Sequence, residues 1–329
     1  MSEIYDVIIV GSGPAGLTAG IYTSRANLKT LVVAGNTWGG QLMQTSLVEN
    51  FPGFVDGVQG PDLMGNMRKQ AERLGVTFVD KNATEVDFTK RPFTINTSPS
   101  NPSPTLGEGS YLGRSVVVAT GAEFKWLGLP NEQKLIGRGV SACATCDAAF
   151  FKDKKVVVVG GGDAALEEAL YLTKFVSSLF IVHRRSEFRA SKIMQDKVFA
   201  NPKIKVIWNA QIIDVVGEQK VESVRLQYLT PNPSPNLGEG NERGEVLPCD
   251  GLFIAIGHTP ATKLFEGKID LDPKFFAKRQ GDKYPTMSNI DGVFIAGDVH
   301  DFRYRQAITA AGYGCEAALD VERWLGENT

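Results

Sequence analysis

Apolar runs of strand length that end in glycine recur along the chain. The first, IYDVIIV at residues 4–10, leads directly into GSGPAG, and a helical pattern then continues to about Asn27. In such a unit Gly11 allows a tight turn, Gly13 lets the backbone approach a pyrophosphate, and Gly16 lets helix and strand pack closely. The helix N-terminus adds partial positive charge. The pattern therefore predicts a dinucleotide site at the start of the chain.

The same succession returns in the middle of the chain. Residues 155–159 form an apolar strand, and GGGDAA follows from Gly160. The next residues have the periodicity of a helix, with Leu166, Leu170 and Thr173 on one face. Two such units predict two nucleotide-binding domains, each built on a parallel sheet with right-handed crossovers.

A basic cluster ends the second strand of this second unit, where an NAD site carries an acidic residue for the ribose hydroxyls. The chain has His183, Arg184 and Arg185 there, with Arg189 a turn later. Guanidinium groups match a 2′-phosphate and leave an uncharged ribose without its acceptor. The second nucleotide is therefore expected to be NADPH rather than NADH. The alternative, a solvated surface cluster, does not explain the register with Gly160.

A third strand pattern lies near the end of the chain. GVFIAGDV, residues 292–299, reads as a buried strand that ends in Gly297 and Asp298. RQA follows at residues 305–307 at the head of a helix, whose backbone amides would suit a flavin ring edge and its ribityl chain. The first nucleotide is therefore predicted to be FAD.

Two further strand-to-glycine stretches, residues 116–122 and 252–258, each close one nucleotide unit. The fold class that follows is α/β, with two Rossmann-like, doubly wound domains, one inserted into the other. We expect an FAD-binding domain of residues 1–124 and 255–329, interrupted by an NADPH-binding domain of residues 125–254.

Two nearly identical stretches interrupt this pattern, NPSPTLGEG at residues 101–109 and NPSPNLGEG at residues 232–240. They are rich in Pro, Ser and Gly and lack apolar periodicity, so we expect hairpin tips or flexible loops. Because loop sites tolerate insertions, we assign them no role.

Charge and hydropathy exclude two kinds of partner. The 329 residues carry 35 Lys and Arg against 37 Asp and Glu, a net charge of −2, so no basic field is available to hold a nucleic-acid backbone. The apolar run Val7 to Val10 is preceded by Glu3 and Asp6 and followed at once by glycines, which predicts neither a signal peptide nor a membrane span. We therefore expect a cytoplasmic protein.

The four cysteines separate into one pair and two single residues. Cys249 and Cys315 stand alone and are expected to be small buried apolar residues. Cys143 and Cys146 form a Cys-x-x-Cys pair, which in a reducing compartment is metal-binding or catalytic. The sequence offers no second half-site for zinc, and a bridge over three residues closes too short a loop to stabilise much. A redox pair is the remaining interpretation.

Asp147 directly follows the pair and strengthens the redox interpretation. A thiolate that leaves a disulfide must be protonated, and a carboxyl whose pKa is raised by burial could supply that proton. A helix N-cap is the alternative role for Asp147, and it does not exclude catalysis. We expect Cys146, beside Asp147, to lie nearer the flavin; the spacing does not decide which sulfur attacks a partner.

Taken in order, these motifs resemble those of the low-molecular-weight, NADPH-dependent thioredoxin reductases over the whole chain. The matching stretches are GSGPAG at 11, GGQL at 39, ENFPG at 49, ATGA at 119, CATCD at 143, GGGDAA at 160, HRRSEFRA at 183, GH-x-P at 257, GDV at 297 and RQA at 305. The chain departs from the family at Ala148 and Ala149, where Gly and a large aromatic residue are common, and Ala34 stands where the general fingerprint has an acid for the FAD ribose.

The resemblance implies site residues, partners and a mechanism. It implies a redox disulfide between Cys143 and Cys146, with Asp147 as the acid, a homodimer, and thioredoxin as the protein substrate. NADPH and the disulfide would reach one flavin in turn through a rotation of the inserted domain. FAD contacts are expected at Gly11, Ser12, Gly13, Pro14, Ala15, Gly16, Gln41, Thr45, Asn50, Thr120, Gly297, Asp298, Arg305, Gln306 and Ala307. NADPH contacts are expected at Gly160, Gly162, Asp163, Ala164, His183, Arg184, Arg185 and Arg189.

Three other functions compete with this one. A related flavoprotein that oxidises small dithiols with oxygen would not need the basic cluster at residues 183–189. A ferredoxin-NADP reductase-like enzyme would not need the Cys-x-x-Cys pair. A flavin sensor without catalysis would have little use for Asp147.

Overall fold

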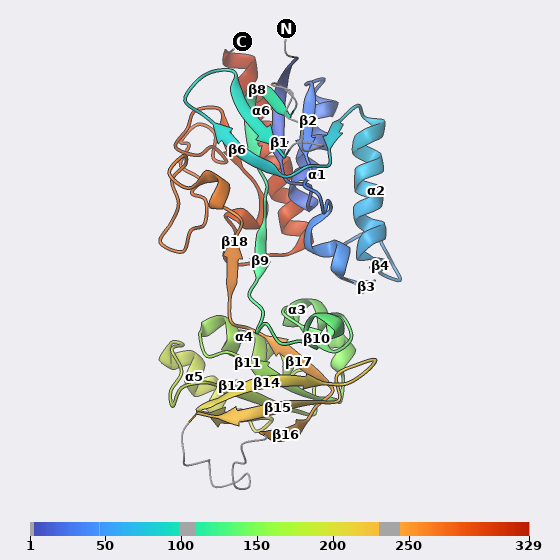
Figure 1. Ribbon diagram of the computed structural model, residues 1–329, viewed down its shortest axis with the longest axis vertical. Helices are drawn as coiled ribbons and strands as arrows, with labels where there is room; N and C mark the ends of the chain where they lie inside the picture. Colours follow the sequence, from blue (N-terminus) through green and yellow to red (C-terminus); the bar gives the residue numbers. More distant parts are fainter. Residues whose placement is uncertain (1–2, 46, 99–108, 230–243, 329) are drawn as a thin grey trace. The chain divides into compact units, whose positions relative to one another are not determined.

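The structure is a computed structural model that describes residues 3–45, 47–98, 109–229 and 244–328 (Figure 1). Residues 101–108 and 232–240, on which the prediction of two loops falls, lie outside the described part. The chain divides into two compact units. Unit 1 consists of Met1–Glu123 and Thr259–Thr329, and unit 2 of Phe124–His258. The sequence predicts that the inserted domain ends at residue 254. In the structure the chain continues past Ile256 and Gly257, and unit 2 ends at His258.

Unit 1 is built on a mostly parallel sheet with strand order β5-β2-β1-β8-β7-β6 in the described residues. Two strands pair with the same edge of β8. β7 pairs antiparallel with the first residues of β8, and β19 pairs parallel with the last residues of β8. The strands are β1 (Ile4–Val10), β2 (Thr30–Val33), β5 (Thr77–Val79), β6 (Ala83–Asp87), β7 (Phe93–Thr97), β8 (Ser110–Val118) and β19 (Val293–Ile295), with a separate pair β3 (Leu47–Val48) and β4 (Val58–Gln59). The helices are α1 (Pro14–Arg25), α2 (Gly60–Arg73) and α6 (Ala307–Asn328), and the 3-10 turns are η1 (Gly40–Gln44), η4 (Lys263–Phe265) and η5 (Gly297–Val299).

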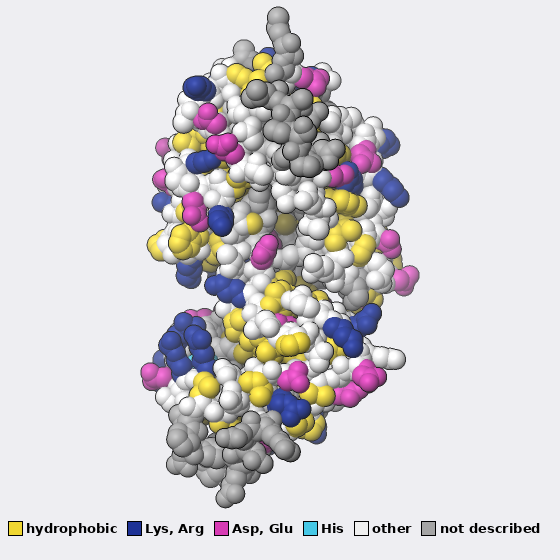
Figure 2. Space-filling view, viewed as in Figure 1, with side chains coloured by type: hydrophobic (Ala, Val, Ile, Leu, Met, Phe, Trp, Pro, Cys, Tyr) yellow, Lys and Arg dark blue, Asp and Glu magenta, His cyan; other side chains and the backbone are white. Residues whose placement is uncertain are grey.

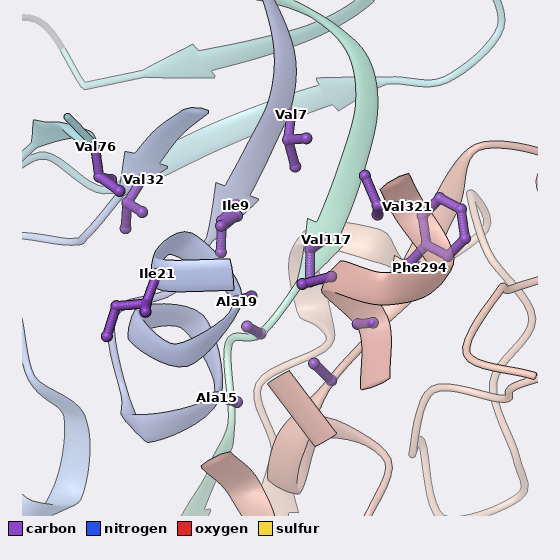
Figure 3. Packing of buried hydrophobic residues seen from close by; sticks show 14 of the residues in the cluster. Val7, Ile9, Ala15, Ala19, Ile21, Val32, Val76, Val117, Phe294 and Val321 are labelled. Carbon is purple, nitrogen blue, oxygen red and sulfur yellow. The ribbon is translucent and has the colours of Figure 1, made fainter. Parts of the chain in front are cut away.

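The alternation of side chains along β1 separates two cores in unit 1. Val7 and Ile9 face α1 and α6, and Figure 3 shows them beside Val117 of β8 and Phe294 of β19. Ile8 and Val10 belong to the cluster on the other face. Both faces are covered, so β1 reads as an almost continuous apolar run, as expected for a buried parallel strand.

Unit 2 contains a second parallel sheet, with order β10-β17-β11-β12-β13, and a separate antiparallel sheet β14-β15-β16. The strands are β10 (Val140–Ser141), β11 (Lys155–Val159), β12 (Ser178–His183), β13 (Ile204–Trp208), β14 (Ala210–Val216), β15 (Ser223–Tyr228), β16 (Glu245–Pro248) and β17 (Gly251–Ile254). The helices are α3 (Ala144–Asp147), α4 (Asp163–Leu172) and α5 (Lys192–Phe199), with 3-10 turns η2 (Gln133–Leu135) and η3 (Ala148–Phe151).

α4 packs on the parallel sheet as the sequence pattern predicts, with one difference. Leu166 and the C-cap residue Thr173 are buried, whereas Leu170 is half-buried. Ala165 and Ala169 complete the buried face, because helix and sheet approach more closely over small side chains.

The two stretches of chain that join the units are short strands, β9 (Ala122–Phe124) and β18 (His258–Pro260), and these pair with each other. They follow directly on the two strand-to-glycine stretches, residues 116–122 and 252–258, that close the nucleotide units. The two parallel sheets, each with helices on it, confirm the predicted α/β class with two Rossmann-like domains.

Candidate active site

Three neighbouring strands of unit 1 end in register at one edge of the sheet. Val10 of β1 pairs with Val118 of β8, and Val118 pairs with Ile295 of β19. The glycine turn that follows Val10 and the Gly-Asp pair that follows β19 therefore meet at this edge. Open α/β sheets bind their ligands outside the carboxyl ends of their strands.

The three glycines of the first turn are glycine for different physical reasons. Gly11 has a φ of +116°, and a Cβ there would lie 2.2 Å from the carbonyl oxygen of Ala119. A Cβ on Gly16 would lie 2.0 Å from the carbonyl oxygen of Gly11. Glycine is therefore required at both positions, because a side chain would collide with the backbone of the protein itself. A Cβ on Gly13 would meet nothing within 4 Å among the described residues, so this is where a phosphate group has room to approach.

Asp298 presents an unused acceptor at the same edge. Its side chain is half-buried in η5, and Oδ1 is inaccessible and has no hydrogen-bond partner within the described ranges. Burial, helped by the nearby charge of Asp301 and opposed by Arg305, raises the pKa of Asp298 to about 7. A buried oxygen without a partner is uncommon in proteins, and a ligand hydroxyl would satisfy it. These features fit a flavin dinucleotide.

The loop before α6 is organised by Asp301, which sequence reasoning missed. Its carboxylate accepts the backbone N–H groups of Arg303, Tyr304 and Arg305 at 2.9, 2.8 and 2.9 Å. These bonds hold Arg305 at a φ of +49°, which directs the chain into α6. An Asp four residues before the RQA stretch was the available signal, since Asp side chains commonly bond the backbone just ahead.

Other residues predicted for the flavin bond to one another or to the backbone of unit 1. Nδ2 of Asn50 donates to Oε1 of Gln306 at 3.2 Å, which brings two predicted contacts together across 256 residues of sequence. The side-chain amide of Gln41 donates to the backbone carbonyl of Ala122 in β9. The backbone carbonyl of Gln41 accepts from the Thr45 hydroxyl at 3.4 Å. The Thr120 hydroxyl donates at 2.7 Å to the backbone carbonyl that follows β18.

The side chains of the first turn serve the turn itself. The Ser12 hydroxyl donates to the carbonyl of Ala34 at 2.7 Å and accepts from the N–H of Gly39 at 3.0 Å. Pro14 begins α1, where a missing N–H costs no helical bond, and Ala15 is buried. Ala34, where the fingerprint has an acid, is buried; its carbonyl accepts from Ser12 and its N–H donates to the carbonyl of Val79 at 2.8 Å.

In unit 2 one sheet edge carries the cysteines, the glycine turn and the basic loop. Ser141 of β10 pairs with Phe253 of β17, and Ile254 of β17 pairs with Val159 of β11. Val159 in turn pairs with Val182 of β12. The redox pair follows β10, the glycine turn follows β11 and the arginines follow β12. β10 and β11 are two strand spacings apart, which is about 10 Å.

The glycines of this second turn repeat the division of roles. Gly160 has a φ of +156°, with the carbonyl oxygen of Ala255 only 2.5 Å from an added Cβ. A Cβ on Gly161 would lie 2.3 Å from Cε1 of His183. A Cβ on Gly162 would meet nothing within 4 Å in the described part of the chain. Gly162 is therefore the position open to a ligand phosphate.

The basic cluster divides into a buried histidine and exposed arginines. His183 is only 5 % exposed and lies against Phe188 and Trp208; burial, as the largest cause, lowers its pKa. Arg184, Arg185 and Arg189 are exposed. Figure 2 shows Lys and Arg side chains gathered on the side of unit 2 where Figure 1 places α5.

The basic loop is tied to the glycine turn by hydrogen bonds. The N–H of Arg189 donates to the carbonyl of Gly161 at 2.7 Å. The N–H and the hydroxyl of Ser191 both donate to Oδ1 of Asp163, at 2.8 and 2.7 Å, and these bonds lower the pKa of Asp163. Asp163 thus holds the loop with its side chain, next to the exposed Ala164 in the first turn of α4.

Cys143 and Cys146 form a disulfide, with their Cα atoms 5.3 Å apart. Cys143 precedes the short helix α3 and is half-buried, whereas Cys146 is exposed. Cys249 is buried, which raises the pKa of its thiol to about 12, and Cys315 is half-buried. No group of three or more His, Cys, Asp or Glu side chains could hold a metal ion in the described residues.

Asp147 lies at the end of α3 and is half-buried. Burial raises its pKa, and a hydrogen bond from the Ser141 hydroxyl, 2.6 Å from Oδ2, acts in the opposite direction. A carboxyl with a raised pKa keeps its proton to a higher pH than an ordinary aspartate, which suits a proton donor. Ser141 was not identified from the sequence, because its contact with Asp147 depends on how the chain turns around the disulfide.

Comparison with known proteins agrees with this arrangement. Residues 5–314 match the family model described as pyridine nucleotide-disulphide oxidoreductase. A thioredoxin reductase of Streptomyces coelicolor is 50% identical over 326 residues, which cover 99% of this chain and 95% of that protein. A thioredoxin reductase of Rickettsia conorii is 48% identical over 98% of each chain. Among solved structures, the thioredoxin reductase from Giardia duodenalis has a TM-score of 0.88 at 39% identity and covers 99% of this chain and 100% of that chain.

None of the helices in the described residues has the length and apolar character needed to cross a membrane. The full-length matches, together with the disulfide and the two nucleotide turns, define the family. The chain belongs to the thioredoxin reductases of the pyridine nucleotide-disulphide oxidoreductase family.

Proposed function

We propose that this oxidoreductase passes electrons from NADPH, through FAD and the Cys143–Cys146 disulfide, to the disulfide of a thioredoxin. The observation that carries the proposal is the position of this disulfide. It lies beside the partly buried Asp147, at the same sheet edge as a glycine turn and an arginine loop. A structural bridge would need neither neighbour.

FAD is the flavin that the residues of unit 1 fit best. The opening beside Gly13 would admit a pyrophosphate at the N-terminus of α1. The unused oxygen of Asp298 would accept a ribityl hydroxyl, and Asn50 and Gln306 lie together at the start of α6. A mononucleotide flavin would leave the glycine turn without a function.

NADPH is the nucleotide that the residues of unit 2 fit best. The opening beside Gly162 would admit the pyrophosphate. Arg184 and Arg185 are exposed and carry fixed positive charge, and the loop that bears them is held against the turn through Arg189. His183 packs at the start of this loop as a neutral, buried ring. We therefore assign binding of the 2′-phosphate to the arginines.

Bound flavin would supply the two-electron chemistry that links the pyridine nucleotide to the disulfide. The chain contributes the groups around it. Asp147 would donate a proton to the sulfur that leaves when the disulfide opens, and its carboxylate would take the proton back when the dithiol attacks a partner disulfide. The exposure of Cys146 would allow a mixed disulfide with another protein.

Alternating use of the flavin follows from where the two reactive groups are carried. Both the nucleotide turn and the disulfide belong to unit 2, whereas the features that fit a flavin belong to unit 1. We propose that unit 2 rotates about the joining strands β9 and β18, so that NADPH and the disulfide reach the flavin in turn.

The family resemblance supports thioredoxin as the partner and a homodimer as the assembly. The cytoplasm is the compartment we propose, because it holds NADPH and keeps thioredoxin dithiols reduced. The net charge of −2 is the reason we propose no nucleic-acid partner.

The test is NADPH-driven reduction of a thioredoxin disulfide by the holoenzyme and by Cys146→Ser. The variant is expected to lose thioredoxin reduction while it still passes electrons from NADPH to an artificial acceptor such as ferricyanide, which does not need the thiols. Cys315→Ser is the matched control and should behave like the wild type. Thioredoxin reduction by Cys146→Ser at the wild-type rate would refute the proposed function.

A further inference from the structure

Ser141 connects the two ends of the redox turn through one hydroxyl group. It is the last residue of β10 and is only 6 % exposed. Its hydroxyl donates to Oδ2 of Asp147 at 2.6 Å and accepts from the N–H of Cys143 at 3.1 Å. A hydroxyl has one proton. The bond from Cys143 N–H occupies a lone pair, and the proton is directed to Oδ2 of Asp147 at 2.6 Å rather than to the carbonyl oxygen of Cys143, which lies 3.5 Å away.

This bond is the polar contact that orients the Asp147 carboxyl in unit 2. Burial and the Ser141 bond are the two influences on its pKa. α4, the helix that packs against α3, carries Asp163, Glu167 and Glu168, and none of these charges contributes to the shift. The turn η3 that follows has only Ala and Phe residues. Among the described residues, the orientation of the carboxyl therefore depends on the hydroxyl of Ser141.

We propose that Ser141 is a positioning residue for the opening of the disulfide: it binds Oδ2 of Asp147 and leaves Oδ1 as the oxygen that carries and exchanges the proton. The inference rests on the proposed function, since it assigns a role within the same electron route. The amide of Cys143 fixes the hydroxyl, so the carboxyl is oriented by the turn that contains the disulfide itself. Oriented acid groups lower a barrier because the proton is already in place.

The step balances in electrons and protons. Two electrons, which come from the reduced flavin under the proposed function, break the bond between the sulfurs of Cys143 and Cys146. Two protons complete the two thiols: one passes from Oδ1 of Asp147 to the leaving sulfur, and the other comes from solvent. The Asp147 carboxylate that results keeps the hydrogen bond from Ser141, which is strengthened by the negative charge.

The test compares Ser141→Ala with Ser141→Thr, which keeps a hydroxyl, and with Ser223→Ala. Ser223 is an equally buried serine, at 7 % exposed, in the β14–β16 sheet of the same unit. Thioredoxin reduction by each holoenzyme is measured against pH. Ser141→Ala is expected to be slowed about tenfold, a part of what general acid catalysis contributes. The inflection at which its rate falls with rising pH should move to higher pH, because the bond that favours the ionised carboxyl is gone.

Two further readouts separate positioning from loss of structure. NADPH-driven reduction of ferricyanide should be unchanged in Ser141→Ala, since it does not use the dithiol. In protein reduced by a small dithiol, the pH profile of thiol alkylation by iodoacetamide should shift in Ser141→Ala and remain at the wild-type position in Ser141→Thr and Ser223→Ala. If Ser141→Ala does not fold, Ser141→Val, which has the shape of the Ser141→Thr side chain without its hydroxyl, makes the same comparison against Ser141→Thr.

The outcomes distinguish this inference from the proposed function. Loss of thioredoxin reduction in Cys146→Ser, with normal rates and unshifted inflections in Ser141→Ala, would overturn the role of Ser141 alone. A uniform loss of rate at every pH, with no shift in either profile, would also overturn it, because a merely structural change produces that result. Normal thioredoxin reduction by Cys146→Ser would overturn both.

Discussion

The imidazole of His183 lies against the α-carbon of Gly161, where an added Cβ would come within 2.3 Å of Cε1. The ring has little freedom to withdraw, because Phe188 and Trp208 lie beside it and it is 5 % exposed. The middle glycine of the second turn is therefore required by packing inside unit 2. The next glycine, Gly162, is the one with open space beside it.

This difference predicts opposite behaviour for two alanine substitutions one residue apart. Gly161→Ala should destabilise the protein by about 1–3 kcal/mol through overpacking against His183, measured by denaturant unfolding. Gly162→Ala should leave the free energy of unfolding nearly unchanged, since its φ of −99° is accessible to alanine, but raise the KM for NADPH about tenfold. Equal stability losses in both variants would contradict the division of roles.

The exposed arginines predict selectivity for the phosphorylated nucleotide. Replacing either Arg184 or Arg185 with Ala should raise the KM for NADPH about 10-fold to 100-fold and change the KM for NADH little, because charge-assisted bonds to a 2′-phosphate contribute about 1.5–3 kcal/mol each. Lys192→Ala, a nearby exposed cation on α5 that pairs with Asp196, is the control. An equal rise for both nucleotides would argue against phosphate recognition.

The raised pKa of Asp298 predicts a pH-dependent stability of the flavin-free protein. Its pKa is about 7 in the folded chain, against an ordinary value of 3.8. A raised folded pKa means that the stabilisation is complete below about pH 4 and is lost as the pH rises to 7. Between pH 4 and 8 the wild type should lose about 1–3 kcal/mol of unfolding free energy relative to Asp298→Asn. Parallel curves for the two proteins would contradict this assignment.

Asp147 predicts a loss of rate as the pH rises through its raised pKa. Burial raises its pKa, so the acid form persists above the range of an ordinary aspartate, and the rate of disulfide opening should fall as the pH rises through that pKa. Asp147→Asn should lack this inflection and be slower by about 100-fold. Stopped-flow measurement of dithiol formation checks both. An unchanged inflection in Asp147→Asn would assign the titration to another group.

The strands, the turns and the redox pair could be predicted because their signals are local. IYDVIIV before Gly11 and KVVVV before Gly160 fix a strand and a turn within a dozen residues, and β1 and β11 begin and end where these patterns do. The Cys143–Cys146 disulfide closes over three residues, so its spacing is itself the signal.

What the sequence did not reveal depends on contacts made in three dimensions. Ser141 and Asp147 are six residues apart, and only the bend at α3 brings them within 2.6 Å. The burial of His183 could not be read from a basic run that continues into Arg184, because the strand β12 ends at the histidine and turns the next side chains to solvent. The antiparallel sheet β14–β16 has too little local periodicity to identify its partners.

The central claim, that electrons from NADPH reside on Cys143 and Cys146 before they reach a partner, can be measured directly. The oxidised holoenzyme is mixed anaerobically with NADPH, quenched with a thiol-specific mass label, and digested for mass spectrometry, with and without oxidised thioredoxin. We predict labels on Cys143 and Cys146 that disappear when thioredoxin is added, while labelling of Cys249 and Cys315 does not depend on NADPH. Reduction of thioredoxin by NADPH with no label ever appearing on Cys143 or Cys146 would contradict the account.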